Sequence, residues 1–464
     1  MPARALRTWF RIADRFARPI LTHGQAPNPL AVAPMSPSPS GDAAPPTRAR
    51  HWVVALAGTL SVIVFVDRTC MSQAKVSMAA DLGLSSVQMG YVFAAFTTAY
   101  ALFEIPGGWL GDLIGPRKVL TRVVLFWSFF TAATGRVWNL ASLLVTQFLF
   151  GAGEAGAIPN LAKAFTRWLP VRERNRAVGV MWLCSRWGGA VTPILVVGII
   201  SLVGWRWAFA VLAVPGVIWA IVFYWWFRDQ PREHPGVNAA ELAIVHEGRP
   251  PAAARPRVPW ARILRSRTVW LLFVQYFCFG YGWYFYITWL PTYLKEARGL
   301  ALQRGALLSG LPLFFGGFAC ILSGWLAGWL VRRGFGLDRV RRGLAFVGYG
   351  GAAAMLLLSP RVDDPLWAML AMGMASFSLD LALPVCWRTA MDVGGEFAGT
   401  ISGTMNMAGQ IGGAVGPIVV GYILQYLNHN WALTFALSAA INVLGGLCWI
   451  WIDPVTPIAR GETA

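Results

Sequence analysis

Charged residues that include Asp67, Arg68, Glu154, Arg186 and Asp380 stand inside long apolar stretches of the 464-residue chain. A charged side chain at the centre of a bilayer costs about 2.5–3.5 kcal/mol on insertion scales, so each such residue needs a partner or a function. The guanidinium group is a planar fork that fits a carboxylate. A buried carboxyl group can exchange a proton, because burial favours the neutral acid and a nearby arginine favours the ion. This set of residues predicts a site that binds an organic anion together with protons.

Arg186 and Glu154 are predicted to lie at similar depth. Arg186 comes about nine residues into its apolar stretch, or ~14 Å deep, and Glu154 about fourteen residues into the preceding antiparallel one. Arg186 then either binds the substrate carboxylate, with Arg68, or forms a permanent pair with Glu154. Asp67 and Glu154 are the proton-carrying candidates, since no histidine falls deep within a stretch. The alternative for Asp67 is an ion pair with another helix.

Polar residues in the second half of the chain extend the candidate site. The hydroxyl and amide groups of Tyr284, Asn406 and Gln410 suit a polyhydroxylated or aromatic acid. Asp380 is either a gate or a structural partner, and Arg388, eight residues later, could share its helix face.

The composition and the lengths of the apolar stretches predict the fold. Hydrophobic residues make up 56% of the chain and charged residues 13%, which is typical of a membrane protein. Twelve stretches are long enough to cross a bilayer at about 20 residues each. They run over 52–72, 87–108, 119–137, 140–162, 177–200, 206–227, 268–292, 303–330, 341–359, 364–388, 397–420 and 430–452. We therefore expect an all-α integral membrane protein with twelve transmembrane helices in two six-helix pseudo-repeats.

The stretches divide the chain into five parts. They are a basic, disordered or surface-lying tail (1–50), two six-helix bundles (51–227 and 267–453), a cytoplasmic linker between them (228–266) and a short C-terminal tail (454–464). The loops after the even-numbered stretches hold far more Lys and Arg residues than the alternate loops, so both termini are expected in the cytoplasm. The first tail is either a basic amphipathic helix on an anionic membrane surface or a dispensable extension, with Met35 as an alternative start.

Several other functions are not supported by the sequence. The net charge of +18 is spread over short loops, so nucleic acid is not an expected partner. No metal-ligand spacing, nucleophile–base combination or phosphate loop occurs, so we expect no enzyme activity, metal or cofactor. The run GAGEAG at 151–156 lies inside an apolar helix, which excludes a dinucleotide site. The expected partners are a small organic anion, protons and the bilayer, with the chain as a monomer.

A repeated motif supports the two halves and leads to a family. The motif GGWLGDLIGPRK at 107–118 is echoed by SGWLAGWLVRRG at 323–334, at the matching place in the second half. The first motif resembles the cytoplasmic loop motif of the major facilitator superfamily, whose parallel repeats enclose a midplane site. By this resemblance Asp112, Arg117 and Lys118 form a latch that changes with conformation.

Further motifs resemble the anion:cation symporter branch of that superfamily and its bacterial hexonate and hexarate transporters. They include VDRTCMSQA (66–74), GAGEAGAIPN (151–160) and AGTISGTMNMAGQIGGAVGP (398–417). The resemblance implies a proton-coupled symporter of a sugar acid in the bacterial inner membrane. It assigns protons to Asp67 and Glu154, and substrate to Arg68 and Tyr100. An exporter or antiporter of another small molecule, and uptake of an aromatic acid or other carboxylate, are the alternatives.

Four positions depart from the family pattern. Val64 and Phe65 stand where two polar residues are common just before the Asp–Arg pair. Gln147 stands where many members carry an arginine, and Glu104 stands where a glutamine is usual. Arg186 on the neighbouring stretch could supply the cation that Gln147 does not. Gln147 itself is expected at the substrate site.

Overall fold

The computed structural model describes residues 45–247 and 260–458 of the chain, and these residues form helices joined by short connections. The first half contains α2 (Ala49–Leu82), α3 (Ser86–Ile114), α4 (Pro116–Thr134), α5 (Leu140–Glu154), α6 (Ala157–Trp168) and α7 (Val171–Trp226). The second half contains α10 (Arg267–Thr288), α11 (Leu290–Glu296), α12 (Leu302–Ser309), α13 (Leu311–Arg332), α14 (Leu337–Leu358), α15 (Pro365–Gly394), α16 (Ala398–Tyr426) and α17 (Trp431–Trp451). The linker carries η1 (Pro231–Glu233), α8 (Ala239–His246) and α9 (Trp260–Arg265), and the turns η2 (Ser359–Arg361) and η3 (Gly395–Phe397) flank α15.

Each of the twelve predicted stretches corresponds to helix in the structure. Three of them are interrupted, because each of these stretches corresponds to two consecutive helices: α5 with α6, α10 with α11, and α12 with α13. Two others are continuous in α7, where Gly204 has a φ of 77° and makes the turn between them. Glycine adopts this left-handed conformation without the steric cost that a side chain would add.

Eight helices of the described residues are long and apolar enough to cross a membrane by length and composition alone. One of these, Arg176–Trp226, has 51 residues and holds two of the predicted stretches. The other three predicted stretches are α3, α4 and α10 with α11. Large apolar side chains such as Trp138 and Leu202 are exposed on the outside, where lipid would cover them.

Polar residues in the connections define where helices begin. The Ser85 hydroxyl accepts a hydrogen bond from the Gln88 backbone N–H, and the Gln88 side chain accepts one from the Ser85 N–H. Asn139 and Ser142 make the same reciprocal cap at the start of α5. Such caps satisfy backbone N–H donors that have no partner within the helix. A helix can therefore begin directly after a short connection.

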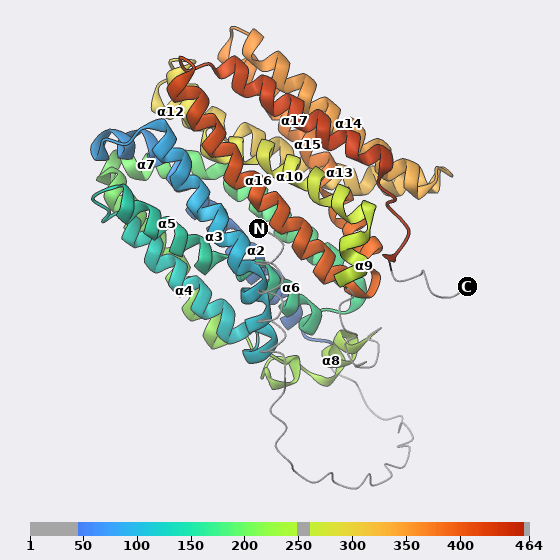
Figure 1. The fold of residues 1–464 in the computed structure, drawn as a ribbon. Helices are drawn as coiled ribbons and strands as arrows, with labels where there is room; N and C mark the ends of the chain where they lie inside the picture. Colours follow the sequence, from blue (N-terminus) through green and yellow to red (C-terminus); the bar gives the residue numbers. More distant parts are fainter. Residues whose placement is uncertain (1–44, 248–259, 459–464) are drawn as a thin grey trace, which may run out of the picture. The chain divides into compact units, whose positions relative to one another are not determined.

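The two halves meet along an interface that we call the seam. In it α3 contacts α16, α7 contacts α12 and α13, and α2 contacts α10 and α11. Figure 1 shows α3 and α16 side by side. If the halves are equivalent, α3 corresponds to α13 and α7 to α16, so the first two contacts are symmetry mates. The repeated motif agrees with this, since it lies at the ends of α3 and α13.

Close helix approach at the seam depends on glycine. A Cβ atom on Gly310, between α12 and α13, would lie 2.2 Å from the backbone oxygen of Ala190 on α7. A Cβ atom on Gly90 of α3 would lie 2.7 Å from the backbone oxygen of Pro417 on α16. Small residues therefore let the backbones of the two halves touch directly. Below, the end of the bundle where α2 begins and α3 ends is called the basic end, and the other end is called the opposite end.

Candidate functional site

Arg68 and Glu154 form an ion pair inside the first half. The Arg68 Nε on α2 donates a hydrogen bond to one Glu154 oxygen at the end of α5, and the Nη2 of the same guanidinium forms an ion-pair contact with that oxygen. Their side chains are 8% and 1% exposed. The rings of Phe65, Phe96 and Tyr100 surround the guanidinium carbon at 5.6, 5.2 and 4.8 Å. This apolar cage lowers the local dielectric and strengthens the attraction of Arg68 for any anion that reaches it.

Asp67 points away from this pair. Successive residues of a helix differ by about 100° in direction, and Asp67 is 3% exposed beside the indole of Trp127 on α4. Neither carboxyl oxygen has a hydrogen-bond partner among the described residues. The expected alternative, an ion pair of Asp67 with another helix, is therefore not present in the described structure.

Arg186 pairs with Asp380 across the seam, which corrects the expected pair with Glu154. The Arg186 Nη2 on α7 donates to the Asp380 Oδ1 on α15 at 2.6 Å, and the side chains are 3% and 0% exposed. The guanidinium carbon lies 4.6 Å from the centre of the Trp283 ring on α10. Arg186 is thus not the partner of Glu154, and the exposed Arg388 is not the partner of Asp380.

Other polar candidates lie on the second half and at the seam. The Tyr284 hydroxyl donates to the Gln410 Oε1 at 2.5 Å, which joins α10 to α16. The Asn406 Nδ2 on α16 donates to the Glu104 Oε1 on α3 at 2.6 Å, across the seam. The second Glu104 oxygen is buried and has no partner within the described residues. The glutamate that departs from the family pattern is therefore a contact between the halves.

A small cavity brings several candidates together. Its volume is about 20 Å³, and Arg68, Met71, Phe93, Phe96, Gln147, Phe150, Tyr284, Ile287 and Thr288 line it. Gln147 does reach this cavity, while its amide donates to the Thr134 hydroxyl at 3.1 Å. A water molecule needs about 10–15 Å³ by this measure, so the cavity in this conformation has room for little more than water. Arg186 and Asp380 do not line it.

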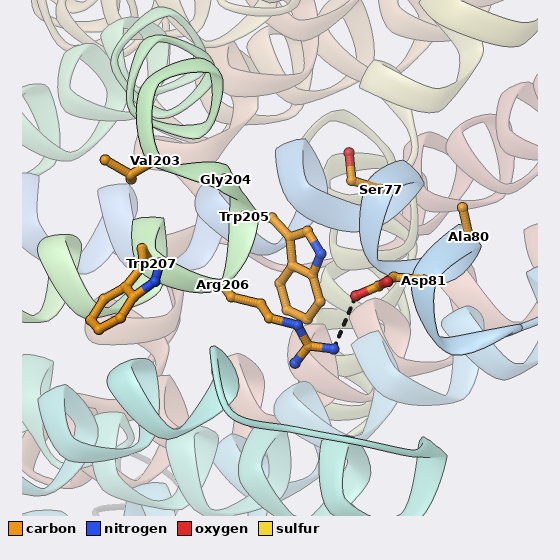
Figure 2. Close-up of a pocket in the computed structure, with 8 residues that line it drawn as sticks. All are labelled: Ser77, Ala80, Asp81, Val203, Gly204, Trp205, Arg206 and Trp207. Atoms are coloured by element: carbon orange, nitrogen blue, oxygen red, sulfur yellow. Dashed lines mark hydrogen bonds and ion pairs between the residues drawn. The ribbon is translucent and has the colours of Figure 1, made fainter.

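A larger hollow of about 630 Å³ lies at the opposite end of the first half (Figure 2). It is formed by the last turns of α2 and by the turn at Gly204 in α7. Figure 2 shows the Arg206 side chain pointing to Asp81, and their Nη2 and Oδ2 atoms are 2.9 Å apart. Both side chains are more than 40% exposed. Because this hollow lies within one half and away from the seam, it is not a candidate for a transport site.

Comparisons with known proteins agree with the two-half architecture. The model of the Major Facilitator Superfamily matches residues 57–417. The chain belongs to this superfamily. A bacterial homologue of the human lysosomal transporter Spinster, solved in an inward-facing and unoccupied conformation, matches with a TM-score of 0.66 and 16% identity. The match covers 87% of this chain and 95% of that one, which establishes the shared fold of twelve membrane helices in two halves.

Three of the relatives are named as transporters of organic anions. The chain is 35% identical over 413 residues to the probable sulfoacetate transporter SauU of Cupriavidus necator, covering 89% of this chain and 95% of that protein. It is 29% identical over 423 residues to the D-galactonate transporter of Escherichia coli, covering 88% and 96%. The probable galactarate/D-glucarate transporter GudP of Escherichia coli is 30% identical over 316 residues, 64% of this chain and 70% of that one. The expected resemblance to hexonate and hexarate transporters is confirmed, and the chain is a multi-pass membrane transporter rather than an enzyme.

The superfamily loop motif lies at the basic end. The side chain of Asp112 lies outside the described part of the structure, and Lys118 is exposed. The Arg117 backbone N–H donates to the Asp229 Oδ1 at 3.0 Å, and its guanidinium donates to the Tyr224 backbone oxygen. Arg167 also pairs with Asp229, at 3.3 Å. Asp229 was not singled out in the sequence, and only its place directly after the sixth apolar stretch could have suggested this role.

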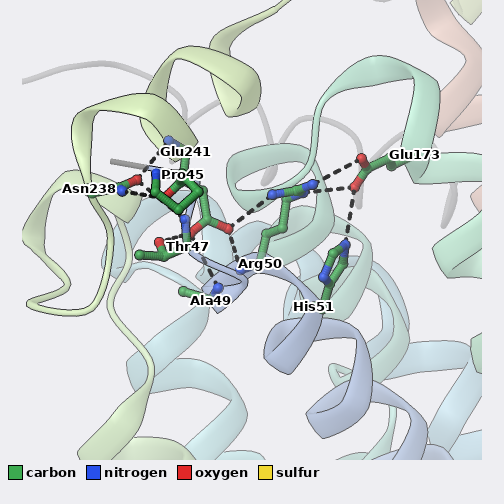
Figure 3. A network of polar contacts seen from close by, with 8 residues as sticks. All are labelled: Pro45, Thr47, Ala49, Arg50, His51, Glu173, Asn238 and Glu241. Atoms are coloured by element: carbon green, nitrogen blue, oxygen red, sulfur yellow. Dashed lines mark hydrogen bonds and ion pairs between the residues drawn. The ribbon is translucent and has the colours of Figure 1, made fainter. Parts of the chain in front are cut away.

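A second network joins the linker to the start of α2 (Figure 3). The buried Glu241 carboxylate on α8 accepts hydrogen bonds from the backbone N–H groups of Ala49 and Arg50, at 3.2 and 3.0 Å. It also accepts from the Thr47 hydroxyl and pairs with the Arg50 side chain. Arg50 in turn reaches Glu173 near the start of α7 at 3.0 Å. The linker therefore caps the first membrane helix, and negative charge at a helix N-terminus is favourable.

Proposed function

We propose that the chain imports an organic anion together with protons by alternating access. The observation that carries this proposal is the Arg68–Glu154 pair, with the unpartnered Asp67 next to it in sequence. A fixed cation in an aromatic cage offers a site for a carboxylate, and two buried acids offer sites for protons. An exporter of cationic molecules would need an anionic cavity, whereas this cavity holds an arginine.

Competition for Arg68 would couple the anion to a proton. Removing one partner from a buried ion pair costs about 3–5 kcal/mol, because the other charge is left without compensation. If the substrate carboxylate takes the place of Glu154 on Arg68, Glu154 avoids this cost by binding a proton. The sum of charges at the site is zero before and after the exchange. The anion and the proton are then bound together or not at all.

Asp67 would provide a second proton site. A buried ion without a partner is costly, so the neutral acid is favoured at its position. A dianionic substrate would need the additional positive charge that a second proton brings. Arg186 remains a candidate for a second acidic group of the substrate, which would have to displace Asp380 first.

The second half would recognise the body of the substrate. Tyr284, Gln410 and Asn406 present hydroxyl and amide groups near the seam, and Tyr100 flanks Arg68. These groups suit the hydroxyls of a sugar acid, which is our first choice of substrate. A short sulfonated carboxylate is the second candidate, because the relative at 35% identity is named for sulfoacetate.

Uptake into proteoliposomes tests the proposal. Purified protein would be assayed with D-galactonate, D-glucarate and sulfoacetate, with and without an inward pH gradient. We expect Glu154→Gln to lose uptake driven by the gradient while exchange of substrate across the membrane partly survives. Glu233→Gln, which changes an exposed acid in the linker, serves as the matched control. Unchanged gradient-driven uptake in Glu154→Gln would refute the coupling role of this residue.

The proposed setting is the inner membrane of a bacterium, with a monomeric chain and both termini in the cytoplasm. The bacterial relatives and the basic residues in alternate loops support this setting. In the same view Asp112, Arg117 and Lys118 belong to the cytoplasmic latch. Fusion of a reporter to each terminus, active on one side of the membrane only, checks the orientation.

A further inference from the structure

Lys75 is a buried lysine without an ion-pair partner. It lies on α2 toward the opposite end and is 4% exposed. Its ammonium group donates to the Thr292 hydroxyl on α11 at 3.1 Å and lies 3.1 Å from the centre of the Trp289 ring. Among the described residues no carboxylate lies within ion-pair distance of Lys75. The Glu296 side chain, one turn beyond Thr292, is exposed and acts on it only at longer range.

Lys75 and Arg68 lie on the same face of α2. A separation of seven residues corresponds to about 10 Å along the helix and about 20° around it. The small cavity extends from Arg68 toward Lys75 along α2, since Met71 and Thr288 line it together with Arg68. Thr292 lies one turn beyond Thr288 toward the opposite end. The two cations therefore follow one another along the same side of the seam.

The partners of Lys75 all belong to the second half, and they would compensate an ammonium charge only incompletely. A hydroxyl and a ring face are neutral groups, and a desolvated cation–π contact contributes about 2 kcal/mol or more. Arg68 and Arg186 each hold a carboxylate in the same conformation. When α2 and α11 separate, Lys75 loses both neutral partners and presents an ammonium group to the opening.

We propose that Lys75 is an anion-binding residue at the opposite end of the seam, where it receives the carboxylate or sulfonate of the substrate before Arg68 does. This inference rests on the proposed function. While the opposite end is closed, Trp289 and Thr292 contact the amine group of Lys75. When that end opens, the substrate anion takes their place. Lys75 thus sets the affinity for substrate that arrives from the opposite side and leaves binding from the basic side unchanged.

Three variants test this role in proteoliposomes with D-galactonate and, separately, sulfoacetate. Lys75→Met removes the charge and keeps much of the length, Lys75→Arg keeps the charge, and Lys295→Met removes an exposed lysine from α11 as the control. We expect Lys75→Met to raise the KM for substrate added at the opposite side by about tenfold, which corresponds to about 1.4 kcal/mol of binding. Lys75→Arg should stay within threefold of the wild type and Lys295→Met should be unchanged. The KM for substrate added at the basic side should not move in any variant.

A chemical rescue separates charge from packing. Lys75→Cys would be treated with a methanethiosulfonate that adds an aminoethyl group, and in parallel with one that adds a neutral group. Restoration of the KM by the cationic reagent alone is the expected result, with the treated wild-type protein as the control for its six cysteines.

The outcomes of these experiments distinguish a failure of the Lys75 role from a failure of the proposed function. An unchanged KM in Lys75→Met, or an equal rise for both sides of the membrane, would overturn the role of Lys75 while the proposed function stands. If Lys75→Met does not yield a monodisperse protein, the two treated forms of Lys75→Cys decide instead, and equal rescue by both reagents overturns the role. If the wild type transports neither acid, the proposed function fails and this inference fails with it.

Discussion

Replacing Asp380 by asparagine is expected to destabilise the protein by leaving Arg186 charged and buried. The pair is 3% and 0% exposed, and its 2.6 Å bond joins α7 of the first half to α15 of the second. Removing one partner of such a pair costs about 3–5 kcal/mol. The Trp283 ring at 4.6 Å faces the guanidinium in the wild type and in the variant alike, so its contribution cancels from the difference. A loss of about 3–5 kcal/mol is therefore expected for Asp380→Asn.

The double variant Arg186→Met with Asp380→Leu should recover most of that stability, because apolar replacements of a buried pair are often neutral or stabilising. Intrinsic fluorescence during thermal unfolding of the purified variants in detergent measures the order of stabilities. The expected order places Asp380→Asn lowest, with the double variant close to the wild type. A double variant that unfolds at a lower temperature than Asp380→Asn would refute the reasoning, because the ion pair would then stabilise the protein more than its isosteric apolar replacement does.

The same double variant decides what Arg186 does in transport. If Arg186 binds a second acidic group of the substrate, the stable double variant loses affinity for dianions such as glucarate and keeps affinity for galactonate. If the pair only holds the halves together, both substrates retain their affinity and the rate of interconversion changes. Equilibrium binding to the purified protein distinguishes these outcomes without any transport step.

Two further predictions concern the basic end. Glu241→Gln should lower the free energy of unfolding by about 2 kcal/mol. Hydrogen bonds to a charged group contribute about 1.5–3 kcal/mol each, and a neutral amide would keep only part of the cap on α2. Chemical unfolding of both proteins measures this difference, and equal stabilities would contradict the role of Glu241 as a cap. Burial, and to a lesser extent the nearby Arg228, lower the pKa of His234 against an opposing effect of Glu241. Its ring packs against Trp168, and its Nδ1 accepts a hydrogen bond from the Gly236 N–H. The folded protein therefore binds this proton less readily than the unfolded chain, so the contribution of His234 to stability is present above pH ~6.5 and is lost as the pH falls. His234→Asn should flatten the dependence of melting temperature on pH below this value, and an unchanged slope would contradict it.

The fold was largely predictable because a bilayer leaves few choices. Backbone groups in lipid must be satisfied internally, so long apolar stretches become helices. The repeated motif at 107–118 and 323–334 also indicated the equivalence of α3 and α13. Interruptions such as the one between α5 and α6 were not predictable, because they depend on packing rather than on composition.

The pairing of charges was less predictable than their presence. Depth along a helix follows from residue counts, and on that basis Arg186 was matched to Glu154. Residue counts do not give the direction in which a side chain points around its helix, or how the second half packs against the first. These two factors place Arg186 against Asp380 instead. Lys75 lay outside the predicted first stretch, which ended at 72, whereas α2 continues to Leu82. Glu241 gave no signal, because its partners are backbone groups about 190 positions earlier.

The three Lys and Arg residues of α2 fit the proposed coupling between the two ends of the transporter. Arg50, Arg68 and Lys75 are separated by 18 and 7 residues, which keeps them on one face within about 20°. Arg50 and Arg68 bind carboxylates of the first half and of α8, so relative motion of the halves leaves these pairs intact. Lys75 alone is held by groups of the second half, and the same motion exposes it. The halves can therefore open at the opposite end without breaking an ion pair of α2, and the charge uncovered there has the sign that attracts the substrate.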